Sequence, residues 1–315
     1  MGLKKTLYYA RWYYLKAIRK LTKKPIPDSK YYPAKKRMTD IDAQNEYIYN
    51  LLMSGKPCMV ARYGATETRA ILQYEHKGCI SFKKELALQR MCRSSGFFPK
   101  DGKLLYRFAE MMEDCSSELD FIALWYVMQD YLVDTYAPKA RVGTLGGLES
   151  WWSDVPWSRA LAGKRVVVVH PFSNTIAAQY KNYDKLFENK EVLPLFQLRC
   201  VRTPVTLNEG ELVEADGCKD WFEALERIYA EVMQEDFDVA IIGCGAYGFP
   251  LAAQIKRAGK QAVHMGGASQ LLFGIMGKRW ETMSVTQMAN EYWTYPLPED
   301  SPENGKLVEN GCYWK

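Results

Sequence analysis

The strongest constraint on the fold of this chain is the regular alternation of short apolar runs and helical patterns that begins at Lys164. The run Arg165–Val169 contains four consecutive valines, which is typical of a strand buried on both faces. The pattern then continues, with strands expected at 192–201, 237–242 and 261–264 and helices at 174–187, 221–234 and 250–258. This alternation predicts an α/β fold with a Rossmann-like, mostly parallel sheet and helices on both faces.

The first half of the chain fits the same fold class. A helix is expected over 42–54, because Gly55 and Pro57 follow it. The apolar run after Pro57 predicts a strand that ends at Arg62. Helical periodicity recurs at 67–76, 84–94 and 102–116, and strands are expected at 120–127 and 140–144. Residues 38–294 are therefore expected to form a single domain.

Charge divides the chain into a basic N-terminus and a mildly acidic body. The net charge is +5, but residues 1–37 carry twelve Lys/Arg and one acid, a local charge of +11, which leaves −6 for the rest. We therefore expect no nucleic-acid-binding surface on the body. The eight cysteines form no CxxC pair, which favours reduced, buried thiols. Residues 295–315 are rich in Pro, Gly and acids and are expected to form an irregular tail.

Residues 1–24 predict a basic amphipathic helix, and a proline-containing linker follows up to residue 37. Apolar side chains recur at helical spacing from Leu3 through Leu7 and Tyr14 to Leu21, and eight Lys/Arg occur without one acid. Such a helix suits an anionic membrane surface. The alternative is a helix docked on the body or on a partner chain. Because no signal-peptide core is present, we expect a cytoplasmic protein that is peripheral at the inner face of the membrane.

The turn Arg62-Tyr63-Gly64-Ala65-Thr66-Glu67 lies between the first expected strand and the next helix. Ligands bind at such turns in open α/β sheets. Arg62 would bind a phosphate, and Tyr63 and Gly64 beside it would contribute to the binding site. Glu67 would hold a metal ion or a hydroxyl group. This combination indicates a phosphorylated, nucleotide-linked substrate. The alternative is an ordinary loop in which Arg62 and Glu67 pair with each other.

A second turn, Gly243–Gly248, has the spacing GxGxxG after a strand and before a helix. The acidic residue that would bind the ribose of NAD is missing, because the next strand ends in His264-Met265-Gly266-Gly267. We therefore interpret the segment as a phosphate- or ligand-facing turn, with the binding candidates Gly243, Gly245, Tyr247 and Gly248. The alternative is that its glycines serve the backbone geometry of a tight turn.

Two of the three histidines, His170 and His264, end strands that are expected to be buried. Since the carboxyl ends of parallel strands face one crevice, both would lie near the same ligand. Their expected role is to donate hydrogen bonds to a diphosphate or to a substrate hydroxyl, and the alternative is a structural role in the core.

Other candidates lie at the helix N-termini that follow the strands. The helix after His170 begins with a polar group suited to an anion, namely Ser173, Asn174 and Thr175. Beyond the last strand we expect Gly267, Gln270 and Arg279 to contribute to binding. Trp280 could stack on a base or sugar, but a core aromatic is the favoured expectation.

The turn at residues 62–67 resembles the Arg-aromatic-Gly-Asp-Gly-Glu motif of the GT-D fold glycosyltransferases. The segment Asp238–Trp280 is also similar to the C-terminal part of such proteins, and the likeness covers the chain from residue 40 to residue 290. The resemblance implies a GT-D-type catalytic domain that binds a nucleotide sugar and holds Mn²⁺ or Mg²⁺ through an Asp-x-Glu pair. In this chain Ala65 stands where the family has Asp, and Glu67 remains.

The resemblance further implies a glycosyltransferase that moves a sugar from a nucleotide sugar, a UDP-sugar above all, to a lipid-linked or glycan acceptor in cell-surface polysaccharide (capsule) biosynthesis. One carboxylate alone is a poor site for a divalent metal ion. Three versions follow: Glu67 holds the metal together with the diphosphate and water, cations such as Arg62, His170 and Arg279 replace it, or the chain binds nucleotide sugar without transferring it. A Rossmann-type enzyme that uses NAD or S-adenosylmethionine is a further alternative.

Overall fold

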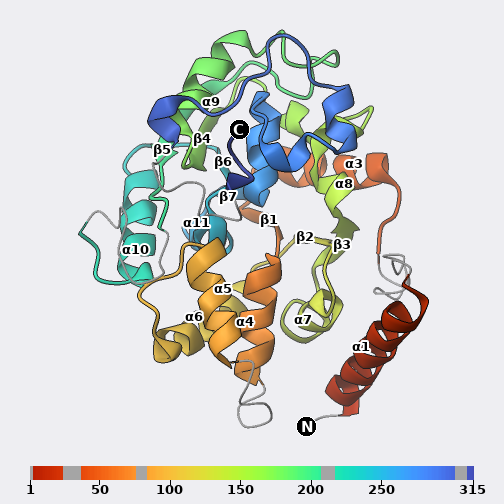
Figure 1. Ribbon diagram of the computed structural model, residues 1–315. Helices are drawn as coiled ribbons and strands as arrows, with labels where there is room; N and C mark the ends of the chain where they lie inside the picture. Colours follow the sequence, from red (N-terminus) through yellow and green to blue (C-terminus); the bar gives the residue numbers. More distant parts are fainter. Residues whose placement is uncertain (1–2, 24–36, 76–83, 207–216, 302–310) are drawn as a thin grey trace.

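The computed structural model describes residues 3–23, 37–75, 84–206, 217–301 and 311–315. Its centre is a seven-stranded sheet with the order β3-β2-β1-β7-β6-β4-β5, in which every neighbouring pair is parallel (Figure 1). The strands are β1 (Cys58–Arg62), β2 (Phe121–Leu124), β3 (Arg141–Thr144), β4 (Arg165–His170), β5 (Gln197–Arg202), β6 (Val239–Ile242) and β7 (Gln261–His264). The predicted Rossmann-like α/β fold is confirmed.

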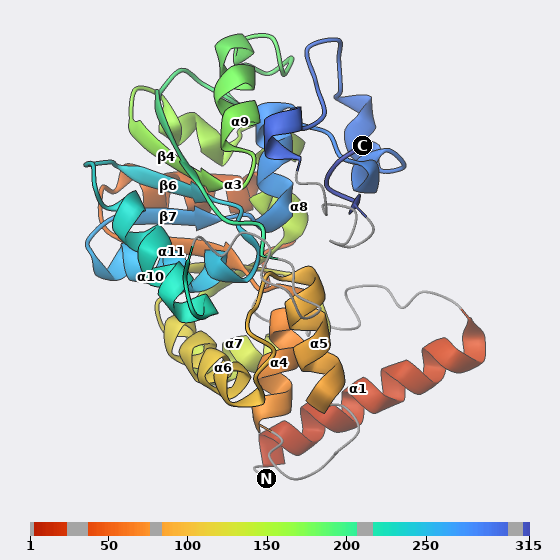
Figure 2. The same ribbon diagram turned by 60° about the vertical axis from the view of Figure 1, so that its left-hand side comes forward.

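Helices cover both faces of the sheet, so that the body has three layers (Figure 2). One face carries α3 (Ile41–Met53), α8 (Leu145–Leu148) and α9 (Ser173–Gln179). The other face carries α4 (Ala65–Glu75), α5 (Lys84–Ser94), α6 (Gly102–Ser116), α7 (Gln129–Tyr136), α10 (Trp221–Val232) and α11 (Gly248–Arg257). Two separate apolar cores result, one on each side of the strands.

Strand β4 explains why the strands of this chain are so uniformly apolar. Val167 and Val169 pack into the core under α10 and α11, whereas Val166 and Val168 pack into the core under α3 and α9. Since successive side chains of a strand point to opposite faces, a strand covered on both sides needs an apolar residue at every position.

Three elements differ from the expectation. Helix α7 was not predicted, because the apolar run after Asp120 continues past the end of β2. There the Gln129 carboxamide oxygen accepts the N–H groups of Trp125 and Tyr126, each at 3.0 Å, and the chain turns into a helix. Helix α9 ends at Gln179 instead of reaching residue 187, and β5 begins only at Gln197, after Pro194, which has no N–H to donate.

The described residues of the C-terminal tail, 295–301 and 311–315, contain only short helical turns such as the 3-10 helix at Pro298–Asp300, and they are packed into the domain. Trp314 lies in the core under α3 and α9, where its ring meets Phe172 edge-on at 5.4 Å. Its Nε1 donates a hydrogen bond to the Asp300 carbonyl at 3.0 Å. The described parts of residues 295–315 therefore belong to the structure that surrounds the pocket described below.

Helix α1 (Leu3–Thr22) forms where the amphipathic pattern predicts it, and the expected linker lies outside the described residues. Tyr8 donates a hydrogen bond to Asp134 of α7 at 2.7 Å, and Arg11 pairs with Asp130 at 3.2 Å. Beyond these contacts the helix extends away from the body (Figures 1 and 2). Among the described helices, none has the length and apolar character needed to cross a bilayer.

Trp221 provides a test of the packing under α10. Its indole is fully buried and stacks on Tyr247 with ring centroids 5.0 Å apart. We expect Trp221→Ala to lower the free energy of unfolding by about 3–5 kcal/mol in urea denaturation, because it leaves a cavity among other rings. Leu195→Ala, at a position that is 60% exposed, should change it by less than about 0.5 kcal/mol. A loss below about 1 kcal/mol for Trp221→Ala would contradict the described packing.

Candidate functional site

A pocket of about 370 Å³ opens at the carboxyl edge of the sheet, a size common for small-molecule sites. It lies where the sheet changes its winding direction, because β4 leads through α9 to the edge strand β5, whereas β6 leads through α11, on the other face, to β7. Ligands of open α/β proteins bind at such switch points. The ends of β1, β4, β6 and β7 all line the pocket, through Arg62, His170, Gly243 and His264.

Arg62 is the most unusual side chain of the pocket. Its Nε atom is buried without a hydrogen-bond partner, and its guanidinium lies 5.2 Å from the ring centroid of Trp125. Burial lowers the pKa of Arg62 from its ordinary value, although a guanidinium in a protein stays charged. Glu67 and Glu149 act on it with opposite charge, but among the described residues neither forms an ion pair with it. The alternative of a simple Arg62–Glu67 pair is therefore not what the structure has.

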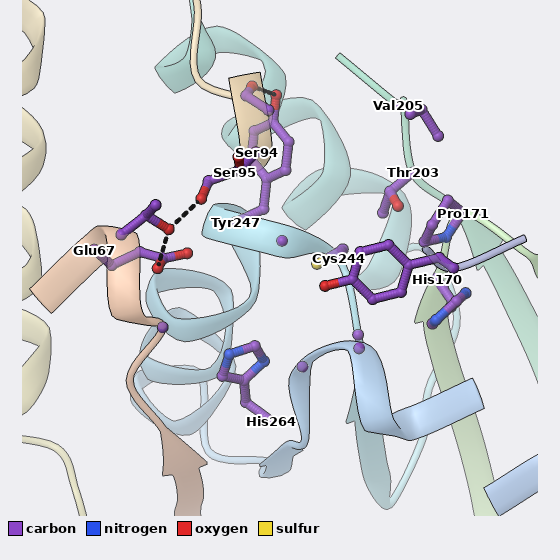
Figure 3. A pocket seen from close by; sticks show the side chains of 18 of the residues that line it. Glu67, Ser94, Ser95, His170, Pro171, Thr203, Val205, Cys244, Tyr247 and His264 are labelled. Atoms are coloured by element: carbon purple, nitrogen blue, oxygen red, sulfur yellow. Dashed lines mark hydrogen bonds between the residues drawn. The ribbon is translucent and has the colours of Figure 1, made fainter. Parts of the chain in front are cut away.

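Glu67 lies in the first turn of α4, only 7% exposed, and its carboxylate lines the pocket (Figure 3). Thr66 donates a hydrogen bond to Glu67 Oε2 at 2.9 Å, and the Ser95 hydroxyl lies 2.6 Å from Thr66 Oγ1. Because Thr66 has only one proton and gives it to Glu67, Ser95 must be the donor of the second bond. A side chain at Gly64 would collide with this carboxylate, so glycine makes room for it.

His170 is held as a neutral donor toward the pocket. Its Nδ1 accepts the N–H of Phe172 at 2.9 Å, so the single ring proton belongs on Nε2. Burial lowers the pKa of His170 to about 3. The neutral imidazole can therefore donate one hydrogen bond from Nε2.

His264 lies between the two walls of the pocket that carry Glu67 and His170 (Figure 3). Its ring touches the start of α11, where any side chain at Gly248 would collide with it. Gly248 thus positions His264 and does not itself line the pocket. Burial, and next the charge of Arg62, lower the pKa of His264 to about 3, and its Nδ1 is buried without a hydrogen-bond partner.

Unpartnered polar atoms gather in this pocket. Buried atoms without a hydrogen-bond partner occur on four residues that line it, namely Arg62, Thr203, His264 and Gln270. Leaving a buried polar group unpaired costs about 1–3 kcal/mol, so such groups are rare in folded proteins unless a ligand or water completes them. Their concentration in one cavity indicates a ligand that offers several hydrogen-bonding groups.

The charge of the pocket is strongly positive. Four arginines line it, Arg62, Arg69, Arg90 and Arg279, whereas Glu67 is the one carboxylate among its described lining residues. No group of three or more His, Cys, Asp or Glu in the described part of the chain is arranged to hold a metal ion. Among the described residues Glu67 is without a second carboxylate, so these residues do not fit a protein-held Mn²⁺ or Mg²⁺.

The segment after β7 forms the wall near Arg62. Gly267 lines the pocket, and the ring of Tyr313 lies so close that a side chain at Gly267 would require it to move. Arg279 donates a hydrogen bond to the Tyr313 hydroxyl at 3.0 Å. The Gln270 amide group donates to the carbonyls of Ile275 and Met276, each at 3.1 Å, which holds this wall in place. Trp280 is 6% exposed and lies in the core, as predicted.

Tyr63 is a correction to the predicted binding set. Its side chain is fully buried and does not line the pocket. The hydroxyl donates to Ser116 at 2.7 Å, and the ring stacks on Phe249 with centroids 4.8 Å apart. Since neighbouring residues of a strand point to opposite faces, an arginine that faces the ligand turns the next side chain into the core.

The anion site expected at Ser173–Thr175 exists, but the anion belongs to the chain itself. The carboxylate of Asp300 accepts hydrogen bonds from the Thr175 N–H at 2.6 Å, the Thr175 hydroxyl at 2.7 Å and the Asn174 amide at 3.0 Å. Asp300 is 1% exposed, and none of the three predicted residues lines the pocket. Asn174 and Thr175 thus hold the C-terminal tail, and Ser173 likewise does not line the pocket.

The remaining members of the Gly243–Gly248 turn line the pocket as predicted, through Gly243, Gly245 and Tyr247. Sequence reasoning missed several lining residues. Trp125 and Thr203 directly follow the ends of β2 and β5, so the strand-end rule applied to every strand would have found them. Tyr313 carries no local signal, because it reaches the pocket from a tail without a periodic pattern.

The two pocket histidines predict how stability depends on pH. Their pKa values of about 3 lie below the value of about 6.5 in the unfolded chain, which therefore binds protons first. The two neutral histidines make their full contribution to the free energy of unfolding above the pKa of the unfolded chain. This contribution is lost as the pH falls toward their pKa in the folded protein. Between pH 7 and pH 5 we expect a loss of about 2 kcal/mol for each histidine in urea denaturation. The variant H170Q/H264Q should lack that loss; an unchanged pH dependence would contradict neutral, buried imidazoles.

Comparison of this chain with protein-family models, with curated proteins and with solved structures finds no match in any of the three. The likeness to the GT-D glycosyltransferases accordingly rests on the sequence motif at residues 62–67 and on the segment 238–280. The function has to be argued from the charge, the unpartnered groups and the position of the pocket.

Proposed function

We propose that this chain is a glycosyltransferase that takes its sugar from a nucleotide sugar, with a UDP-sugar favoured, and transfers it to a lipid-linked or glycan acceptor in cell-surface polysaccharide biosynthesis. The observation that carries the proposal is that one turn brings two groups to a cationic pocket: Arg62, which has no ion-pair partner among the described residues, and Glu67, the one carboxylate among the described lining residues. The position at a switch point of a parallel sheet and the motif at residues 62–67 support it.

In this proposal, arginines take over the role that the divalent metal ion has in the GT-D family. When the bond between the anomeric carbon and the diphosphate breaks, negative charge grows on the departing nucleoside diphosphate, and fixed cations stabilise it. Arg62 is the best placed, because burial makes its charge act through little water. Arg279, held by Tyr313, is a second cation on the same wall, and His170 would donate one hydrogen bond from Nε2.

Glu67 is the proposed base. The acceptor hydroxyl oxygen forms the new bond to the anomeric carbon, and its proton passes to the carboxylate. Thr66, supported by Ser95, holds Oε2 of Glu67, which leaves Oε1 for the acceptor. A base held by the Thr66 hydroxyl, which Ser95 holds in turn, needs no rearrangement before it accepts a proton.

Binding is tested by thermal shift and calorimetry with UDP-, GDP- and CMP-sugars, NAD(P) and S-adenosylmethionine, each with Mn²⁺ and with EDTA. We expect a nucleotide sugar to bind in EDTA, and Arg62→Ala to weaken it about 10- to 100-fold, which is the loss of a charge-assisted hydrogen bond. Arg257→Ala, which removes exposed ion pairs to Asp114 and Glu118, should leave the affinity unchanged. Binding of NAD or S-adenosylmethionine alone would overturn the assignment.

Turnover separates an enzyme from a protein that only binds nucleotide sugar. With the donor found in that screen, Glu67→Gln should lower the release of nucleoside diphosphate about 10²–10⁴-fold, because the amide cannot accept the proton. Its donor affinity should stay within about threefold, since the shape is kept. The exposed helix residue Glu226 offers a matched control, Glu226→Gln, with normal turnover. Native turnover in Glu67→Gln, or none in the native chain with any acceptor, would reject Glu67 as the base.

A further inference from the structure

Helix α1 leaves its apolar face uncovered. Leu7, Ala10, Tyr14, Ala17 and Leu21 follow each other at spacings of three and four residues and therefore share one face of the helix. All five are exposed, with exposed fractions of 62% for Leu7, 65% for Tyr14 and 83% for Leu21. The apolar face of α1 is thus exposed to water. Such exposure is unfavourable, so this face is a candidate binding surface.

The body holds α1 by a different side of the helix. Tyr8 and Arg11 contact Asp134 and Asp130 of α7, and the ring of Tyr8 packs on Tyr131 with centroids 5.5 Å apart. The expected alternative of a helix docked on the body thus holds for the first half of α1, while its apolar face stays exposed. Because the docked residues lie in the first half, the second half projects clear of the body (Figures 1 and 2).

From this arrangement we propose that the exposed face of α1 binds the surface of an anionic lipid bilayer. The occupant is indicated by charge, because the first 24 residues carry eight Lys/Arg and no acid. Leucines and a tyrosine on one face of a basic helix match the composition of helices that lie in the headgroup region. A helix of 20 residues is about 30 Å long, so one straight side can lie flat on a membrane.

The inference is independent of the proposed function, since it uses none of the pocket residues. Two exposed leucines at the ends of the face, Leu7 and Leu21, are the residues to change. Glutamine removes the apolar side chain and keeps both the net charge and a good helix propensity. The exposed Leu195 on the body provides the matched control.

The experiment is vesicle flotation of the full chain without nucleotide. We expect the native protein and Leu195→Gln to float with phosphatidylcholine vesicles that contain 30 mol% phosphatidylglycerol. The variant L7Q/L21Q should bind at least about tenfold less, and pure phosphatidylcholine or about 0.5 M salt should also reduce binding of the native chain. Circular dichroism and the affinity for the screened nucleotide sugar should be unchanged in L7Q/L21Q.

Three results would overturn the inference. The native chain fails to float with anionic vesicles, or L7Q/L21Q floats as well as the native chain. The third is a native dimer in light scattering that L7Q/L21Q converts to a monomer, since the face would then be covered by a second copy. Because nucleotide-sugar binding is measured separately in the same samples, failure of membrane binding is distinguishable from failure of the proposed function.

Discussion

The site depends on the reversal of winding direction between β4 and β6. Because α9 and α11 leave the sheet on opposite faces, the strand ends between them stay uncovered, and the residues that follow them face a common space. This places a half-buried arginine from β1, two neutral histidines from β4 and β7 and a glycine turn from β6 in one pocket. The strands that supply these groups are held in place by the two apolar cores. The folded protein can therefore tolerate the local cost of leaving polar groups of the pocket without hydrogen-bond partners.

The surroundings of Arg62 show how the fold prepares a cationic site. Burial makes this charge costly, and no described carboxylate pairs with it. Arg279 nearby adds to the cost, as its effect on the pKa of Arg62 indicates. An anion that fits the pocket would relieve both the unpaired hydrogen-bond donor and the repulsion, and such relief favours binding. The chain uses the same principle internally, where Asp300 satisfies the N-terminus of α9 and thereby fastens the tail that carries Tyr313.

Much of this arrangement could be predicted from the sequence, because strands buried on both faces are recognisable by their apolar runs. The rule that ligands meet the carboxyl ends of parallel strands correctly placed Arg62, Glu67, His170 and His264 in one pocket. The errors have tertiary causes. Tyr63 faces the core because strand residues alternate, and the anion at Thr175 proved to be a carboxylate 125 residues away. No local pattern reveals such long-range contacts, nor that Tyr313 folds back to the pocket.

In the proposed function, arginines of this pocket, without a protein-held metal ion, receive the diphosphate of a nucleotide sugar. A crystal structure of the chain with UDP-glucose, grown in EDTA, tests it most directly. We expect diphosphate oxygens within about 2.7–3.2 Å of the guanidinium groups of Arg62 and Arg279, with the sugar beside Glu67. A diphosphate bound away from Arg62, or one that enters the pocket only with Mn²⁺ coordinated by Glu67, would rule out a cationic, metal-free site.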